Sequence, residues 1–145
     1  MKQRLLATLF LLPVIAFSQA FKADDLLGQW LTGSGKAGVT IYKEGARYHG
    51  KITWLKNPND EAGKAKADKN NPDEKKRSVL LLGLNLLKDF IFEGEDKWID
   101  GTIYDPENGK TYSCRITMIS KDQLEVRGFV GISLLGRTQN WWRMK

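Results

Sequence analysis

The sequence contains few of the residues that build metal sites and disulfides. Cys114 and His49 are the single cysteine and the single histidine among 145 residues. A structural zinc site uses about four Cys or His ligands, so a dedicated zinc site is excluded, and a lone cysteine forms no internal disulfide. The acidic stretch that begins at Asp68 resembles a calcium loop, but Pro72 occupies a ligand position and the terminal glutamate is missing. We expect no metal and no cofactor.

Blocks of like charge are also missing, and long apolar runs are absent beyond the first residues. Lys and Arg (23) are interspersed with Asp and Glu (17), which does not produce the basic stripe of a nucleic-acid-binding protein. Residues 1–4 are basic and precede an apolar run over residues 5–17, too short to span a hydrocarbon core of about 30 Å. We therefore predict a signal peptide over residues 1–18, cleaved before Gln19 or alternatively after Ala20, and no transmembrane anchor. The mature chain, residues 19–145, is expected to be a single periplasmic or secreted domain.

Short stretches of alternating apolar and polar residues, separated by turn residues, dominate what remains. This pattern predicts eight antiparallel strands, at residues 26–32, 39–43, 48–55, 90–92, 98–105, 111–119, 123–132 and 137–144. Residues 56–77 are polar and are predicted to form a long loop, either a lid or an excursion from the fold. Residues 78–88 are rich in leucine and are compatible with a short helix or a buried strand, although Gly83 argues against one long helix.

Two motifs at opposite ends of the mature chain favour closure of the sheet into a barrel. Gly28-Gln29-Trp30 lies on the first predicted strand and Trp141-Trp142-Arg143 on the last, and these strands become neighbours only if the sheet closes. A Gly-x-Trp motif on the first strand with a late arginine resembles the lipocalin and calycin signature. The resemblance implies that Trp30 and Arg143 form a structural plug at one end, stabilised by a cation–π interaction. The expected fold is an all-β, eight-stranded, up-and-down antiparallel barrel.

A closer resemblance extends over nearly the whole mature chain. Its motifs occur in this order: Gly28-x-Trp30, Gly50-Lys51-Ile52-x-Trp54, Asp68 with Asn71-Pro72, Gly83, Ile103-Tyr104-Asp105-Pro106, Gly109-Lys110-Thr111-Tyr112, Val126-Arg127-Gly128, and Leu135-Gly136-Arg137-Thr138-Gln139-x-Trp141-x-Arg143. With this ordered set, the sequence resembles a bacterial exported family known as domain of unknown function 2147. The resemblance implies a lipocalin-like barrel in the periplasm and no established activity.

Aromatic side chains on the predicted strands suggest a binding site inside the barrel. A barrel strand points alternate residues inward, and eight strands enclose enough room for one small ligand. The residues expected to contact such a ligand are Trp54, Tyr104, Tyr112, Arg127 and Trp141, with Arg127 selecting an acidic head group. The alternative is that the rings fill the barrel completely, because small barrels are often packed solid.

Three functional hypotheses follow. The preferred one is a non-enzymatic carrier that holds a small apolar or amphipathic molecule, such as a lipid or fatty acid, with residues 56–77 and 80–87 over the mouth. The second is an envelope-interaction module with a filled barrel, whose loops bind an anionic polymer or a protein partner. The third, less favoured, is an enzyme that uses Cys114, His49 or strand carboxylates, none of which occurs in a recognisable catalytic motif.

Overall fold

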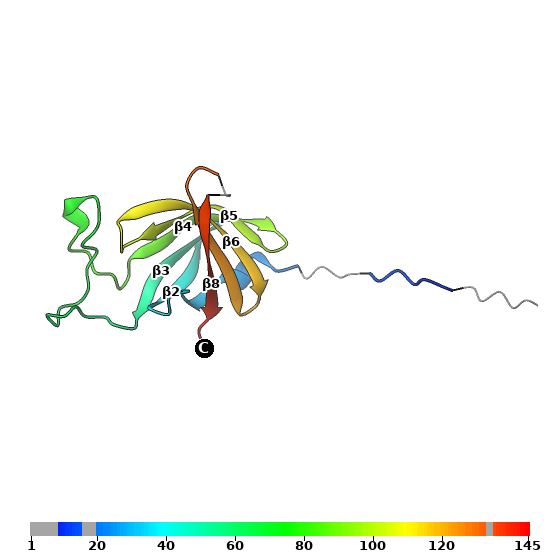
Figure 1. Cartoon of the computed structure of the whole chain (residues 1–145), viewed down its shortest axis with the longest axis horizontal. Coiled ribbons are helices and arrows are strands. Elements are labelled where there is room, and N and C mark those ends of the chain that lie inside the picture. Colours follow the sequence, from blue (N-terminus) through cyan, green and yellow to red (C-terminus); the bar gives the residue numbers. More distant parts are fainter. Residues whose placement is uncertain (1–8, 16–19, 133–134) are drawn as a thin grey trace, which may run out of the picture.

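The computed structural model describes residues 9–15, 20–132 and 135–145, and its main body is a closed barrel of eight antiparallel strands (Figure 1). Each strand pairs with the next along the chain. This confirms the predicted up-and-down barrel. The strands are β1 (Gly28–Leu31), β2 (Ala37–Glu44), β3 (Arg47–Leu55), β4 (Asn85–Gly94), β5 (Lys97–Asp105), β6 (Lys110–Ser120), β7 (Gln123–Phe129) and β8 (Gly136–Arg143).

The pairing of the first strand with the last closes the barrel. Trp30 of β1 is in register with Arg143 of β8, and Leu31 is in register with Trp142. Closure removes the two edges of unpaired backbone groups that an open eight-stranded sheet would expose. The two motifs that predicted closure therefore lie side by side, although more than a hundred residues separate them in the sequence.

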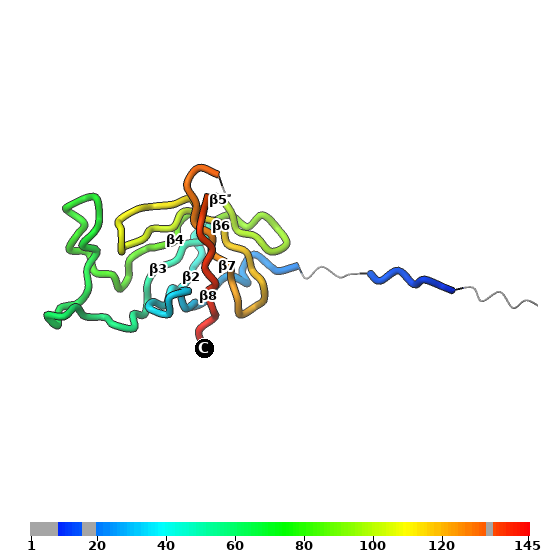
Figure 2. Tube along the Cα trace, in the orientation of Figure 1, coloured from blue at the N-terminus to red at the C-terminus, as the bar shows by residue number. Residues whose placement is uncertain are grey.

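The connections divide the barrel into two different ends. Tight turns join β2 to β3, β4 to β5 and β6 to β7 at one end, where the 3₁₀ helix η1 (Ala23–Leu26) also lies. The longer connections lie at the other end, and the longest, residues 56–84 between β3 and β4, is called the long connection below. Figure 2 shows the long connection, in green, and the segment around η1, in blue, at opposite ends of the barrel.

The leucine-rich segment is neither a helix nor one continuous buried strand. It is a turn followed by the first residues of β4, which begins at Asn85. Gly83 adopts a φ of +93°, a left-handed conformation that glycine accepts easily and that interrupts regular structure. Leu86 and Leu87 of β4 are buried, whereas Leu80 before the turn and Leu82 within it are exposed. The leucine-rich segment is thus partly in the core and partly on the surface.

The hydrophobic core fills the half of the barrel near the tight turns. Its largest fully buried side chains include Trp30, Trp98, Tyr48, Phe90 and Met118, which come from five different strands. Residues 9–15 lie outside this core with exposed apolar side chains, and the predicted cleavage point before Gln19 falls outside the described residues. No helix in the described part of the chain is long and apolar enough to cross a membrane.

Candidate functional site

The end of the barrel opposite the core contains a cavity of about 960 Å³. Ile52, Leu86, Val126 and Trp141 form its floor, and all four are buried and apolar or aromatic. The four connections at this end surround its mouth and contribute polar and apolar side chains. Small-molecule pockets typically measure about 300–1,000 Å³ and combine an apolar lining with a few polar groups. The cavity has the size and the lining of such a pocket.

The opposite end of the barrel is blocked by an arginine stacked on a tryptophan. The Arg143 guanidinium carbon lies 4.1 Å from the centroid of the Trp30 ring. Its three nitrogens donate hydrogen bonds to the backbone carbonyls of Lys121, Leu27 and Asp25, at 2.7, 2.9 and 2.9 Å. Each of these bonds involves a charged donor, which makes it stronger than a bond between neutral groups. This network ties β8, the β6–β7 turn and the residues around η1 together.

The position of Gly28, two residues before Trp30, leaves no room for a side chain. Its φ is +123°, and a Cβ atom there would lie 2.7 Å from Nη1 of Arg143. Any larger residue at this position would displace the guanidinium from the Trp30 ring. The same end is covered further by η1, because Trp98 donates to the carbonyl of Ala23 and the Tyr48 hydroxyl donates to Asp24. The cavity therefore opens at only one end of the barrel in the part of the chain that the structure describes.

The long connection is fixed to the barrel by a buried carboxylate, although its polar sequence indicated nothing to bury. Asp68 is 1% exposed, accepts a hydrogen bond from the Tyr104 hydroxyl at 2.7 Å, and accepts another from the Asn71 amide at 2.8 Å. Asn70 also donates to the carbonyls of Pro106 and Glu107 in the β5–β6 turn. The long connection is thus an ordered part of the wall beside the cavity.

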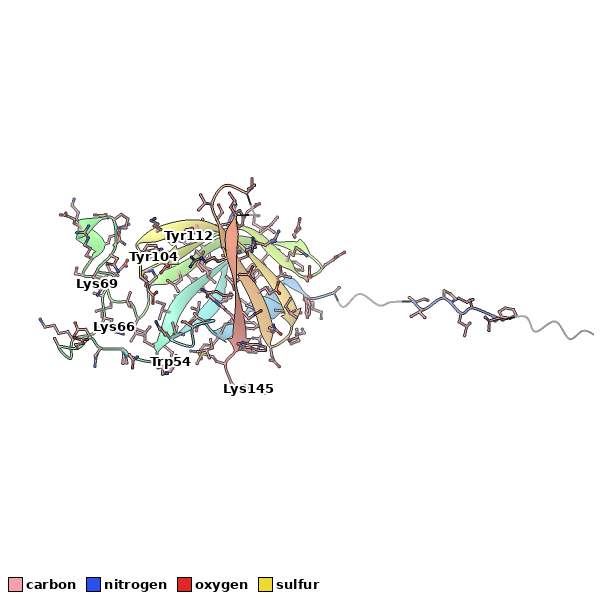
Figure 3. All side chains as sticks on the ribbon, in the orientation of Figure 1. Trp54, Lys66, Lys69, Tyr104, Tyr112 and Lys145 are labelled. Atoms are coloured by element: carbon pink, nitrogen blue, oxygen red, sulfur yellow. The ribbon has the colours of Figure 1, made fainter. Side chains whose placement is uncertain are left out.

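The Tyr104 hydroxyl serves this anchor. Burial, together with the hydrogen bond to Asp68, raises the pKa of Tyr104 to about 12, so the phenol is neutral and donates at physiological pH. Figure 3 shows Tyr104 and Tyr112 at the end of the barrel beside the long connection, which carries Lys66 and Lys69. The Tyr112 hydroxyl accepts a hydrogen bond from the Asn108 amide.

Three of the five residues predicted to contact a ligand line the cavity. They are Tyr104, Tyr112 and Trp141. The Tyr104 hydroxyl already donates to Asp68, so it is not available to bind the polar group of a ligand. Trp141 belongs to the floor, and its indole nitrogen donates to Gln139.

Trp54 does not line the cavity, which corrects the sequence-based expectation. The alternation of β3 places Tyr48 and Ile52 inside the barrel and would place Trp54 there too. However, Val39 pairs with Ile52 while Gly38 pairs with Trp54, so β3 has one extra residue at this point. Such a β-bulge reverses the facing of the residues that follow. Trp54 is consequently 39% exposed on the outer surface, and its neighbour Leu55 lines the cavity.

Arg127 also lies on the outer face and requires a second correction. Its neighbours Leu124 and Val126 face the interior of β7, so Arg127 faces outward by alternation. Its guanidinium donates to the Thr138 hydroxyl on the adjacent strand at 2.8 Å. Arg127 therefore supports the pairing of β7 with β8 and does not reach the cavity.

Two polar residues of β8 line the cavity but were not among the residues predicted from the sequence. Arg137 and Gln139 face the same side of the strand as the buried Trp141, at intervals of two residues. Arg137 is paired with Gly128, which has no side chain to occupy the space beside it. The alternation counted back from Trp141 was the signal that would have identified both residues.

The structure does not bring Cys114 and His49 together as a catalytic pair. Cys114 is buried inside the barrel on β6, whereas His49 lies on β3 among outward-facing residues and accepts a hydrogen bond from the Asp89 amide. Within the described ranges, no group of three or more His, Cys, Asp or Glu residues is placed to hold a metal ion.

The Cys114 thiol is expected to be unreactive in the folded protein. Burial raises the pKa of this thiol to about 12, and the thiolate is the reactive form. We predict that a thiol-specific reagent at pH 8 labels native protein very slowly and labels one thiol per chain after unfolding in urea. Fast labelling of the native protein would show that the wall around Cys114 opens readily.

Comparison with known proteins agrees with this architecture. No significant match was found among curated proteins. Among solved structures, the chain is similar to protein HP1028 from the human pathogen Helicobacter pylori, described as belonging to the lipocalin family, with 26% identity, 83% of each chain covered and a TM-score of 0.72. The family described as "Uncharacterized protein conserved in bacteria (DUF2147)" matches residues 28–143. The chain therefore belongs to the DUF2147 family of bacterial proteins and has a lipocalin-like fold.

Proposed function

We propose that this protein is a non-enzymatic binding protein that holds a small apolar or amphipathic molecule in its barrel. The observation that carries the proposal is the cavity of about 960 Å³, open at one end and floored by Ile52, Leu86, Val126 and Trp141. A barrel packed solid along its whole length would leave no such space. The lipocalin-like fold supports the same reading, since such barrels enclose small ligands.

Export to the periplasm or beyond the cell is part of the proposal. The apolar side chains of residues 9–15 are exposed and contribute nothing to the core, as expected for a segment that is removed after targeting. A protein without internal disulfides must then be stabilised by its core alone, and the buried tryptophans and the Arg143 network provide that stability. Amino-terminal sequencing of the exported protein tests this point, with Gln19 or Phe21 expected as the first residue.

Filling the cavity is the direct test of binding. Leu86 lies on the floor, so Leu86→Phe adds volume inside the cavity, and we expect it to weaken binding of an apolar fluorescent dye by tenfold or more. Ile91→Phe makes the same chemical change on the outer face of the same strand, where Ile91 is exposed, and serves as the matched control. Thermal unfolding should show that both variants are folded.

Two results would contradict the proposal. Equal dye binding by the two variants would place the dye on the outer surface. A complete lack of uptake by the unaltered protein, combined with salt-sensitive adhesion to anionic envelope polymers, would favour the alternative of an envelope-interaction module.

A further inference from the structure

The cavity-lining side chains of β8 become less polar from the mouth of the cavity to its floor. From the mouth to the floor, the inward-facing residues of this strand are Arg137, Gln139 and Trp141. At about 3.3 Å per residue, Arg137 and Trp141 are separated by about 13 Å along the strand. One wall thus presents a cation near the mouth, an amide in the middle and an aromatic surface at the bottom.

Arg137 is the cation of this wall that is available to a ligand. Its side chain forms no hydrogen bond or ion pair with any residue that the structure describes, unlike Arg143, which donates three hydrogen bonds. Arg137 is paired with Gly128 of β7 and is preceded by Gly136. Because neither glycine has a side chain, neither of them covers the guanidinium. An arginine in such a position can donate two parallel hydrogen bonds to a carboxylate or phosphate.

The charged residues that line the cavity include one more cation than acid when Arg137 is counted. The lining includes three cationic residues, Lys36, Lys66 and Arg137, and two acidic residues, Asp105 and Glu107. Lys36 lies 3.6 Å from Glu107, and an Asp105 carboxylate oxygen accepts the backbone N–H of Glu107. Both acidic side chains therefore already interact with residues of the β1–β2 and β5–β6 connections. One additional negative charge would balance the lining residues themselves; the Asp68 carboxylate lies behind them, bonded to Tyr104.

We infer that the cavity selects an amphiphile with an anionic head group, which Arg137 binds near the mouth while the hydrocarbon chain lies against the floor. This inference rests on the proposed function and specifies the chemistry of its ligand. Gln139 contributes its amide N–H groups between the two ends, because its oxygen already accepts the Trp141 indole N–H. Lys66 of the long connection adds a second positive charge at the rim.

Calorimetric titration with matched ligands tests the inference. Decanoate and decan-1-ol have the same chain length and differ in the charge of the head group. We expect decanoate to bind at least tenfold more tightly, because a hydrogen-bonded ion pair adds to the same apolar contact. Arg137→Gln should remove this preference by weakening decanoate alone, and Arg137→Lys should restore part of it. Decyltrimethylammonium, which carries a positive head group, should bind more weakly than the alcohol.

Arg127→Gln is the control for a general loss of positive charge. It removes an arginine from the adjacent strand on the outer face and is expected to leave the decanoate preference unchanged. Equal affinities for the acid and the alcohol, or an Arg137→Gln variant that keeps the preference, would overturn the head-group assignment while the binding function stands. Failure to bind either molecule would overturn both the assignment and the proposed function.

Discussion

Replacing Trp30 with alanine is expected to lower the free energy of unfolding by about 3–5 kcal/mol, the range for truncating a large buried aromatic residue. The indole is fully buried at the closed end of the barrel, its nitrogen donates to the Leu26 carbonyl, and the Arg143 guanidinium lies over its ring. Truncation leaves a void, removes the hydrogen bond and deprives the arginine of its stacking partner. Equilibrium unfolding in urea measures this loss.

Trp142→Ala provides the matched control. Trp142 is 51% exposed on β8, beside the residue that pairs with Trp30. Its truncation removes an indole of equal size from the outer surface, where substitutions usually change stability by about 0.5 kcal/mol or less. If the two variants lost similar stability, the closed end would not depend on the Trp30–Arg143 stack.

Removal of the Asp68 carboxylate is expected to release the long connection from the barrel. Asp68→Ala leaves the Tyr104 hydroxyl and the Asn71 amide, both partly buried, without their acceptor, and a buried donor left unpaired costs about 1–3 kcal/mol. We expect a loss of stability of this order and much faster proteolysis after the lysines of the long connection. Urea unfolding and limited digestion with trypsin report the two effects separately.

Asp60→Ala is the control within the same segment. The Asp60 carboxylate accepts a local hydrogen bond from the backbone N–H of Lys64, and Asp60 is exposed. Its loss should leave both the unfolding curve and the tryptic cleavage rate nearly unchanged. An Asp68→Ala variant that behaves like Asp60→Ala would mean that packing alone, without the buried carboxylate, holds the long connection in place.

The strands themselves follow from local pattern. The alternation in residues such as Leu124, Val126 and their polar neighbours fixes which face of β7 is buried, and regular turns make the strands antiparallel. Closure required one non-local argument, namely that Gly28-x-Trp30 and Arg143 belong to the same site. The glycine is needed there because its missing Cβ makes room for the guanidinium.

The candidate site was harder to predict because it depends on register. Arg127 was chosen for its charge, although alternation with Val126 already assigned it to the outer face. Trp54 was misplaced for a different reason, since a β-bulge reverses its facing and a bulge has no clear signature in the sequence of β3. The correct cation, Arg137, could be found by counting back from a buried Trp141, but only after Trp141 and not Trp142 was known to point inward.

The long connection shows the limit of composition as a guide. Its abundance of Lys, Asp and Asn predicted an exposed loop, and most of its side chains are exposed. One of its carboxylates is nevertheless buried, because its hydrogen bonds come from a tyrosine of β5, far away in the sequence, and from nearby Asn71. Sequence pattern contains no signal for a partner at that distance. The same contact places the long connection beside the cavity.

Native mass spectrometry of the exported protein, purified without detergent, tests the central claim most directly. If the cavity holds a small molecule, the spectrum should contain a species heavier than the bare chain by one ligand, and extraction should release that ligand for identification. Protein that was stripped of ligand should take up one decanoate per chain. A spectrum of bare chain alone, with no uptake of decanoate or of an apolar dye, would contradict the account.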